Sequence, residues 1–162
     1  MHEASKPKST RPHMPGYGIP KTAKGLLLWT WAEQRLKKSH NYWISTARPD
    51  GSPHTMIVWG LWLDGAFYFS TGDQSRKAKN LANNPKCVIC TEHAEQAVVA
   101  EGTATPTTEP AILKRFGALY QKKYKWDMSG FAEPVYVVRP HVAFGLYEKD
   151  FVGSATRWRL DT

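Results

Sequence analysis

Cysteine is scarce in this 162-residue chain, whose two cysteines, Cys87 and Cys90, form a C-x-x-C pair. Such a pair can perform redox chemistry or bind a metal ion. The chain has no second cysteine pair, however, and its six histidines are scattered without the spacing of metal ligands. Residues 86–92 (KCVICTE) are typical of a strand, on which residues three apart face opposite sides. We therefore interpret both cysteines as small apolar residues of a sheet and expect no metal site.

Long apolar runs are absent as well. No stretch approaches the ~20 residues that a membrane-spanning helix needs. The N-terminus also lacks the secretory pattern of a charged start, an apolar core and a small-residue cleavage site. These absences predict a cytoplasmic protein that does not associate with a membrane.

Acidic residues are few, since 14 Asp and Glu stand against 22 Lys and Arg, and the formal charge is +8. A basic balance permits nucleic acid, an anionic membrane surface or a phosphorylated ligand as a partner. Much of this charge lies in the first 38 residues, which weakens the case for a basic face on the folded part. The aromatic residues are expected to alternate into a core, which argues against nucleic acid stacked on an exposed surface.

The length predicts one domain, and 41% hydrophobic residues can fill its core. Residues 1–24 mix prolines with basic residues and show no helix or strand periodicity. We predict that they form an arm and that residues 25–162 form the single domain. Seven tryptophans are many for this length. We expect some of them to line a groove or a subunit interface, where amphipathic rings are favoured.

Period-two patterns between tight-turn signals predict short antiparallel strands. R-P-D-G at residues 48–51 and D-G at 64–65 are strong turn signals between the first three strands. The strand at 54–63 is apolar at nearly every position, so we expect both of its faces to be covered. The predicted strands are residues 41–47, 54–63, 66–71, 86–92, 96–104, 135–140 and 141–149, with 154–160 as a candidate for a last one.

Three helices are predicted between these strands. The first begins at the capping box Thr30-x-x-Glu33, the second covers about 75–83, and the longest begins near Pro110 and runs to about 124. Short strands with few helices between them favour a mainly β fold, an antiparallel barrel of six or seven strands flanked by helices. A β-sandwich is the alternative, although sandwiches rarely carry a long helix late in the chain.

The stretch of residues 67–85, FYFSTGDQSRKAKNLANNP, combines groups that suit a phosphate. An aromatic strand ends in Ser70 and Thr71, and a short turn leads to a helix that begins near Ser75 with two cations behind it. Hydroxyl and backbone donors, positive charge and the positive end of a helix dipole are what a phosphate needs. On charge alone, the alternative is a solvated basic helix.

The order of these motifs resembles one family. A strand, R-P-D-G-x-P, an apolar strand that ends in Trp, D-G, F-x-F-S-T, S-R-K-x-x-N-L and N-P follow one another between about residues 41 and 102. This series is similar to the flavin-binding split barrels related to pyridoxamine 5′-phosphate oxidase, and S-R-K is its specific element. The resemblance implies a split β-barrel that binds FMN and a homodimer that holds the cofactor between its subunits.

The resemblance also implies a set of cofactor-binding residues. The strand before the D-G turn would lie along the flavin ring, and the next strand's aromatic-hydroxyl end and the Ser-Arg-Lys group would follow. A glutamine would reach the flavin, and the C-terminal Trp with Arg157 or Arg159 would touch the ring from the partner subunit. Apolar walls would come from Ile57, Trp59 and Phe69. The full set is His54, Thr55, Met56, Ile57, Val58, Trp59, Phe69, Ser70, Thr71, Ser75, Arg76, Lys77, Gln96, Arg157 and Trp158.

The chain departs from the true oxidases at two ring-lining positions, where they have Arg and Lys and this chain has His54 and Trp59. Their group for a substrate phosphate is also missing, so we do not expect pyridoxamine-phosphate oxidation. The resemblance implies an FMN-dependent oxidoreductase that transfers hydride to or from a small or aromatic substrate, with no catalytic residue identified. The deazaflavin F420 is the alternative cofactor. A non-catalytic flavin or haem carrier or sensor is the alternative function.

Overall fold

The strands form one antiparallel sheet. In the computed structural model, which describes residues 6–160, they are β1 (Lys8–Thr10), β2 (Tyr42–Ala47), β3 (Pro53–Val58), β4 (Gly60–Leu63), β5 (Ala66–Ser70), β6 (Lys86–Thr91), β7 (Gln96–Thr107), β8 (Val135–Tyr147) and β9 (Thr156–Arg159). Their order is β1-β9-β8-β7-β6-β2-β3, with β5 paired to β8 and β4 to β5. The mainly β, antiparallel fold with flanking helices is confirmed. Residues 1–5 of the predicted arm and 161–162 of the predicted domain lie outside the described residues.

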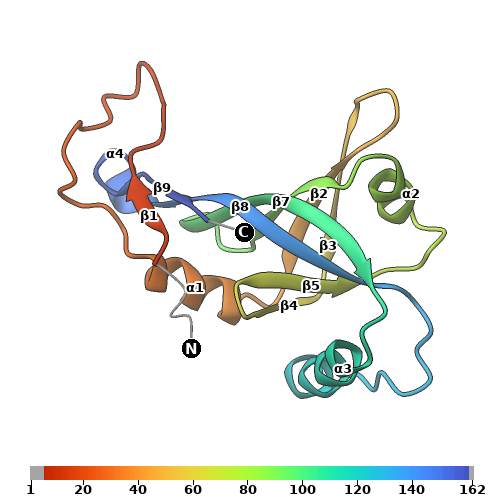
Figure 1. Cartoon of the computed structure of the whole chain (residues 1–162). Helices are drawn as coiled ribbons and strands as arrows, with labels where there is room; N and C mark the ends of the chain where they lie inside the picture. Colours follow the sequence, from red (N-terminus) through yellow and green to blue (C-terminus); the bar gives the residue numbers. More distant parts are fainter. Residues whose placement is uncertain (1–5, 161–162) are drawn as a thin grey trace.

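The helices flank this sheet, with α1 (Trp29–Lys38) packed on its inner face (Figure 1). The others are α2 (Arg76–Asn83), α3 (Pro110–Tyr124), the 3-10 turn η1 (Glu148–Asp150) and α4 (Phe151–Ser154). Figure 1 shows β1 and α4 at one end and α2 and α3 at the other. None of the helices within residues 6–160 is both long and apolar enough to cross a membrane.

The first helix begins earlier than its sequence motif predicts. Leu28 is the residue before α1 and makes no side-chain cap, while Thr30 lies inside the helix, so the predicted capping box is wrong. The reason is the packing of Trp29 in the first turn. Its ring meets Trp62 and Trp158 edge-on, with ring centroids 6.1 and 5.5 Å apart. Burial of a large aromatic residue outweighs a cap worth about 1 kcal/mol.

The strand predicted over residues 54–63 is broken at Trp59 into β3 and β4. At Gly60 a Cβ would stand 2.2 Å from the Phe67 ring, so only glycine allows the chain to pass here. Before the break, β3 is an edge strand that pairs with β2 alone. The prediction that both faces of the whole strand are covered is therefore wrong for β3, because Thr55–Ile57 are exposed in the single chain.

One long strand, β8, replaces the two strands predicted over residues 135–140 and 141–149. Its pairing with β7 shifts register between Glu101 and Gly102, opposite Pro140. A proline has no N–H to donate to a ladder, so the break expected between the two predicted strands takes the form of a bulge within one strand. A Cβ on Gly102 would lie 2.5 Å from the carbonyl oxygen of Arg139, so glycine permits this close approach.

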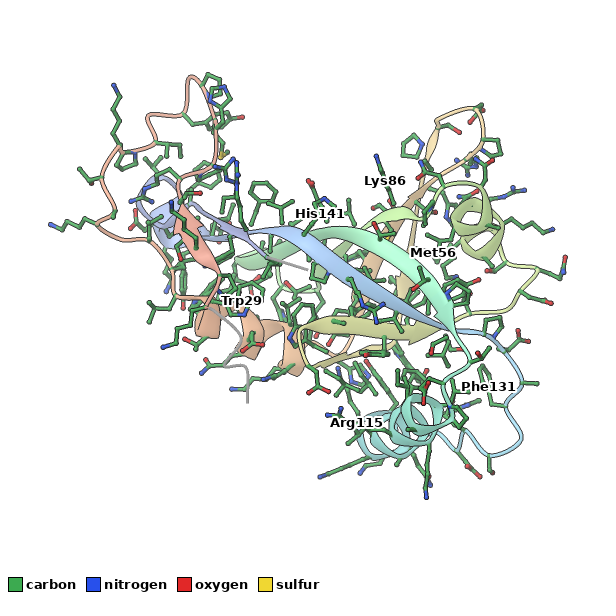
Figure 2. The ribbon with its side chains drawn as sticks, viewed as in Figure 1. Trp29, Met56, Lys86, Arg115, Phe131 and His141 are labelled. Atoms are coloured by element: carbon green, nitrogen blue, oxygen red, sulfur yellow. The ribbon has the colours of Figure 1, made fainter. Side chains whose placement is uncertain are left out.

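The main core lies on the inner face of the sheet, next to α1. Alternation along the strands turns Tyr42 of β2 and Ile89 of β6 to this face, and both are at most 1% exposed. A smaller core packs Phe116 of α3 against β4, β5 and β8. Arg115 of α3 forms an ion pair with Asp64 in the β4–β5 turn, which holds α3 at that end (Figure 2).

The C-x-x-C pair lies on β6 with its side chains on opposite faces, as predicted. Cys87 is buried and Cys90 is half-buried. Burial raises the pKa of the Cys87 thiol to about 12 and also raises the pKa of Cys90. Both thiols therefore stay protonated at neutral pH, the form that is a poor nucleophile and a poor metal ligand.

The arm is attached to the domain through β1, which pairs with β9. Arg11 reinforces the attachment, since its guanidinium donates to the carbonyl oxygens of Thr22 (3.0 Å), Gly153 (2.7 Å) and Ala155 (3.0 Å). A three-residue strand is too short to show a period in the sequence. These long-range bonds are therefore visible only in the folded chain.

Candidate functional site

The N-terminus of α2 forms a cluster of donors next to the end of β5. Ser75 is the N-cap, and its Oγ accepts a hydrogen bond from the N–H of Ala78 at 3.1 Å. The hydroxyl of Thr71 donates to the same Oγ at 3.0 Å. Arg76 and Lys77 are the first two residues of the helix. Free N–H groups and the helix dipole make this end attractive to an anion.

Three basic side chains act on His54 between this helix end and β3. Burial lowers the pKa of His54 on β3, and the positive charges of Arg48, Lys77 and Arg76 lower it further. Within residues 6–160, no carboxylate lies within 4.0 Å of Arg48, Arg76 or Lys77. The described part of the chain therefore does not neutralise this positive charge by an ion pair.

The residues of this cluster fit a phosphate group. The Nδ1 atom of His54 is buried and has no hydrogen-bond partner among the described residues. The ammonium group of Lys77 is partly buried, and burial lowers its pKa. An unsatisfied buried polar atom and a partly desolvated cation both cost free energy, which an anionic acceptor would recover. A phosphate monoester offers several acceptor oxygens and negative charge at once.

The edge strand β3 lies alongside this cluster. Thr55, Met56 and Ile57 are exposed, while the Val58 side chain is buried at 6% exposure. The hydroxyl groups of Thr55 and Ser45 are hydrogen bonded at 2.8 Å. Because β3 pairs with β2 only, its other edge has backbone groups that no described strand satisfies. The middle of β3 is thus open to a flat ligand.

Aromatic residues close the other end of β3. The Trp59 ring stacks on Tyr124, with centroids 4.7 Å apart and planes 6° from parallel, and its indole N–H donates to Asn41 Oδ1 at 3.1 Å. The Tyr124 hydroxyl accepts the N–H of Gly60 at 2.9 Å and donates to the carbonyl of His40 at 2.7 Å. Stacking and hydrogen bonds together fix Trp59 where the strand breaks.

Lys123 lies next to this break. Its Nζ donates to the Tyr42 hydroxyl at 2.9 Å and to the Gly60 carbonyl at 3.0 Å. Burial lowers the pKa of Lys123 to about 8, against a smaller opposing effect of Glu92. The folded chain therefore releases this proton at a lower pH than the unfolded chain, whose lysine pKa is about 10.4.

This difference predicts a pH dependence of stability. Between about pH 8 and 9.5 the unfolded chain holds more protons at Lys123, so the free energy of unfolding should rise with pH. Lys123→Met should flatten this rise, as measured by urea denaturation at pH 7.0 and 9.5. Lys122→Met, at an exposed position on the same helix, is the matched control and should keep the rise. An unchanged rise in Lys123→Met would contradict the assignment.

Two predicted binding residues on β5 have other roles in the structure. Phe69 is 0% exposed and stacks on Tyr136 with centroids 5.3 Å apart, so the predicted wall against a ligand is wrong for this side chain. The reason is that β5 pairs on both sides, with β4 and β8, and lies between the two cores. Ser70 donates to the carbonyl of Pro134 at 2.7 Å. Thr71 is therefore the hydroxyl of this strand end that reaches Ser75.

The C-terminal strand separates its two predicted residues. On β9, Trp158 points into the core and is 0% exposed, so it cannot touch a ligand on another subunit as predicted. Strand alternation turns its neighbours Arg157 and Arg159 to the outer face, which is the physical reason for the difference. Arg157 donates to the Thr10 hydroxyl at 3.1 Å. Gln96, at the start of β7, accepts a hydrogen bond from Arg35 of α1.

Sequence reasoning missed two residues that shape the site. Arg48 belongs to a turn signal and gave no sign of acting on His54. Asn80 of α2 is fully buried and donates Nδ2 to the Thr46 hydroxyl of β2 at 3.0 Å, which holds the helix on the sheet. The only signal for Asn80 was its place in the S-R-K-x-x-N motif. The other site predictions stay predictions about a bound cofactor.

The fold and the site define an antiparallel β protein in which a cluster of cations and hydrogen-bond donors, suited to a phosphate, lies next to an open edge strand. The family model of pyridoxamine 5′-phosphate oxidase matches residues 30–144, so the chain belongs to this family. The family that the motifs resembled is therefore confirmed. No curated protein matches the sequence.

Several solved structures share the fold. A FAD-binding protein from Mesorhizobium loti is 15% identical, with a TM-score of 0.61 over 82% of this chain and 95% of that one. An F420 reductase is 19% identical, with a TM-score of 0.55 over 68% and 94%. A heme binding protein from Mycobacterium smegmatis is 20% identical, with a TM-score of 0.58 over 72% and 53%. At these identities the likeness establishes the fold alone.

Proposed function

We propose that this protein binds FMN and transfers hydride between it and a small or aromatic substrate. The main support is a set of cations, Arg48, Arg76 and Lys77, that have no acidic partner within residues 6–160 and lie next to the open edge of β3. Arg76 would grip the phosphate as a two-pronged donor and Lys77 would act as a point charge. The ring would then lie along the exposed residues Thr55–Ile57.

The residues of the chain would bind and orient rather than react. A flavin-type cofactor supplies the hydride chemistry itself when it is bound. Ile57 and Trp59 would exclude water from one end of the ring. The unpaired backbone edge of β3 offers hydrogen bonds to a flat polar heterocycle, as edge strands do for other ligands. The proposal assigns no side chain as an acid or a base.

A second copy of the chain would cover the outer face of the sheet. Cross-strand pairing places one continuous apolar row on this face, and every member of the row is at least partly exposed. The row is Ile57, Trp43, Cys90, Val99 and Phe144. Monomers rarely leave so continuous an apolar strip in water. Two such sheets packed face to face would bury it, and we propose a homodimer of this kind.

Arg157 supports this arrangement. It pairs with Phe144, the last member of the apolar row, and so lies at the end of that row on the outer face. In the proposed homodimer Arg157 would approach the partner copy, where its guanidinium could contact a ligand held against β3. The proposal thus makes Arg157 an interface residue, whereas Trp158 lies in the core.

Two alternatives have specific support. The deazaflavin F420 would use the same phosphate residues, and one structural neighbour is named an F420 reductase. A carrier or sensor without turnover is the alternative of another class, and one neighbour is named a heme binding protein. We do not propose pyridoxamine-phosphate oxidation, because His54 and Trp59 stand where the true oxidases have Arg and Lys.

The absorbance spectrum of the purified protein tests the proposal. We expect flavin bands near ~375 and ~450 nm, and FMN as the ligand released on denaturation and identified by mass spectrometry. If the protein is purified without ligand, titration with FMN should restore these bands. A single band near ~420 nm would indicate deazaflavin or haem instead, and the mass of the ligand distinguishes them. A colourless protein that binds neither flavin type would contradict the proposal.

A further inference from the structure

A second polar pocket lies between the last turn of α1 and the turn before β7. It is a cavity of about 380 Å³ bordered by Arg35, Lys38, His93, Glu95 and Gln96, among others. Its lining includes neither Arg76 nor Lys77. We propose that this pocket binds a small carboxylate in a way that needs neither Arg76 nor Lys77.

Arg35 is the central group of this pocket. Its guanidinium carbon lies 3.8 Å from the Trp31 ring centroid, and one nitrogen donates to the Trp31 carbonyl at 3.0 Å. Another nitrogen donates to Gln96 Oε1. The Nε atom is buried and has no hydrogen-bond partner among the described residues. The planar fork is thus held in place while part of its donor capacity is unused.

Arg35 has no acidic partner in the described part of the chain. Among residues 6–160, no carboxylate lies within 4.0 Å of its guanidinium. Glu95, the acidic residue of the pocket lining, lies with its carboxylate 3.6 Å from His93 Nδ1. A fixed guanidinium without a counter-ion is the group that pairs best with a planar carboxylate.

Other donors surround the same space. Lys38 follows Arg35 by three residues on α1, so their side chains lie on one face of the helix, with Cβ atoms roughly 5–6 Å apart. Since Gln96 Oε1 accepts from Arg35, the amide nitrogen of Gln96 is left to donate elsewhere. Gln34 adds a second amide to the lining. Two cations and two amides around one cavity suit a ligand rich in acceptor oxygens.

The pocket is close to the proposed ring site. Thr91 in its lining pairs with Tyr42, and Tyr42 pairs with Val58 of β3. Adjacent strands are about 4.8 Å apart, so Thr91 lies roughly 10 Å from the end of β3. A carboxylate held by Arg35 could therefore belong to a molecule that extends toward β3.

Calorimetric titration of the full chain with malonate tests the pocket, with neutral malonamide as the matched ligand control. We expect malonate to bind and malonamide not to bind. Gln96→Glu keeps the shape of the side chain but places a carboxylate against Arg35, so malonate affinity should fall about tenfold or more. Arg35→Lys keeps the charge, loses the fork and should weaken binding similarly. Lys37→Gln, at an exposed position on the same helix and outside the pocket lining, should bind as the unaltered chain does.

The double substitution Arg76→Ala with Lys77→Ala separates this pocket from the cofactor site. Malonate affinity should be unchanged in that protein. The proposal is overturned if the unaltered chain does not bind malonate, or if binding is lost in this double variant and kept in Gln96→Glu. Thermal unfolding of each variant shows whether it is folded, and the two pocket variants give independent readings.

Discussion

Replacing both Arg76 and Lys77 by alanine should reduce FMN affinity by about 100-fold or more while the fold is retained. Each side chain would contribute a charge-assisted hydrogen bond to the phosphate, worth about 1.5–3 kcal/mol, and 1.4 kcal/mol corresponds to a tenfold change. Neither residue has an acidic partner within residues 6–160, so its removal breaks no ion pair there. Fluorescence titration with FMN measures the affinity, and thermal unfolding checks the fold.

Riboflavin makes this experiment specific for the phosphate. The unaltered chain should prefer FMN to riboflavin strongly, and the double variant should bind the two with similar affinity. Lys79→Ala with Lys86→Ala is the matched control, because it removes the same charge from two exposed positions. FMN affinity that is unchanged in the Arg76 and Lys77 variant would show that the phosphate is held elsewhere.

The second large effect is expected at the outer face of the sheet. Trp43 and Ile57 are 43% and 48% exposed and face each other across β2 and β3. Trp43→Glu with Ile57→Lys should convert the proposed dimer to a monomer, since burial of charges at an interface costs several kcal/mol per ion. Within one chain the new pair has opposite charges on neighbouring strands, which favours the sheet. Analytical ultracentrifugation measures the assembly state.

Leu113→Glu with Phe131→Lys is the control for this experiment. It makes the same kinds of change at apolar residues that are 38% and 42% exposed and lie outside the sheet. The control should remain dimeric and keep its FMN. A monomeric unaltered chain, or a dimer that survives Trp43→Glu with Ile57→Lys, would contradict the proposed interface.

The cluster of donors and cations at the start of α2 could be located from the sequence because its parts are local. Ser75 can cap α2 and place Arg76 and Lys77 in the first turn through bonds within four residues. The turns before β3 and after β4 are likewise short motifs whose backbone angles follow from Gly, Asp and Pro. The same locality explains why the succession of β5, α2 and β6 along the chain was predicted correctly.

The positions of the aromatic and amide residues could not be predicted in this way. Phe69 and Trp158 lie on strands whose sequence pattern shows that side chains alternate between two faces. The pattern does not show which of these faces other elements cover. The contact of Gln96 with a flavin stays a prediction, but the hydrogen bond that its Oε1 accepts from Arg35, 61 residues earlier in the chain, had no signal in the sequence. Contacts over such separations depend on the assembled sheet.

Motif order along the chain was thus enough to identify the family, the antiparallel architecture and the helix end that offers donors to a phosphate. Residue spacing within ten positions controls turns, caps and alternation, and these features need no distant partner. Four features depend on the folded chain: the break at Trp59, the exposure of β3, the effect of the Arg48 charge on His54, and the pocket around Arg35. Each of these depends on side chains far apart in sequence that compete for the same space, so only the packed structure could select among them.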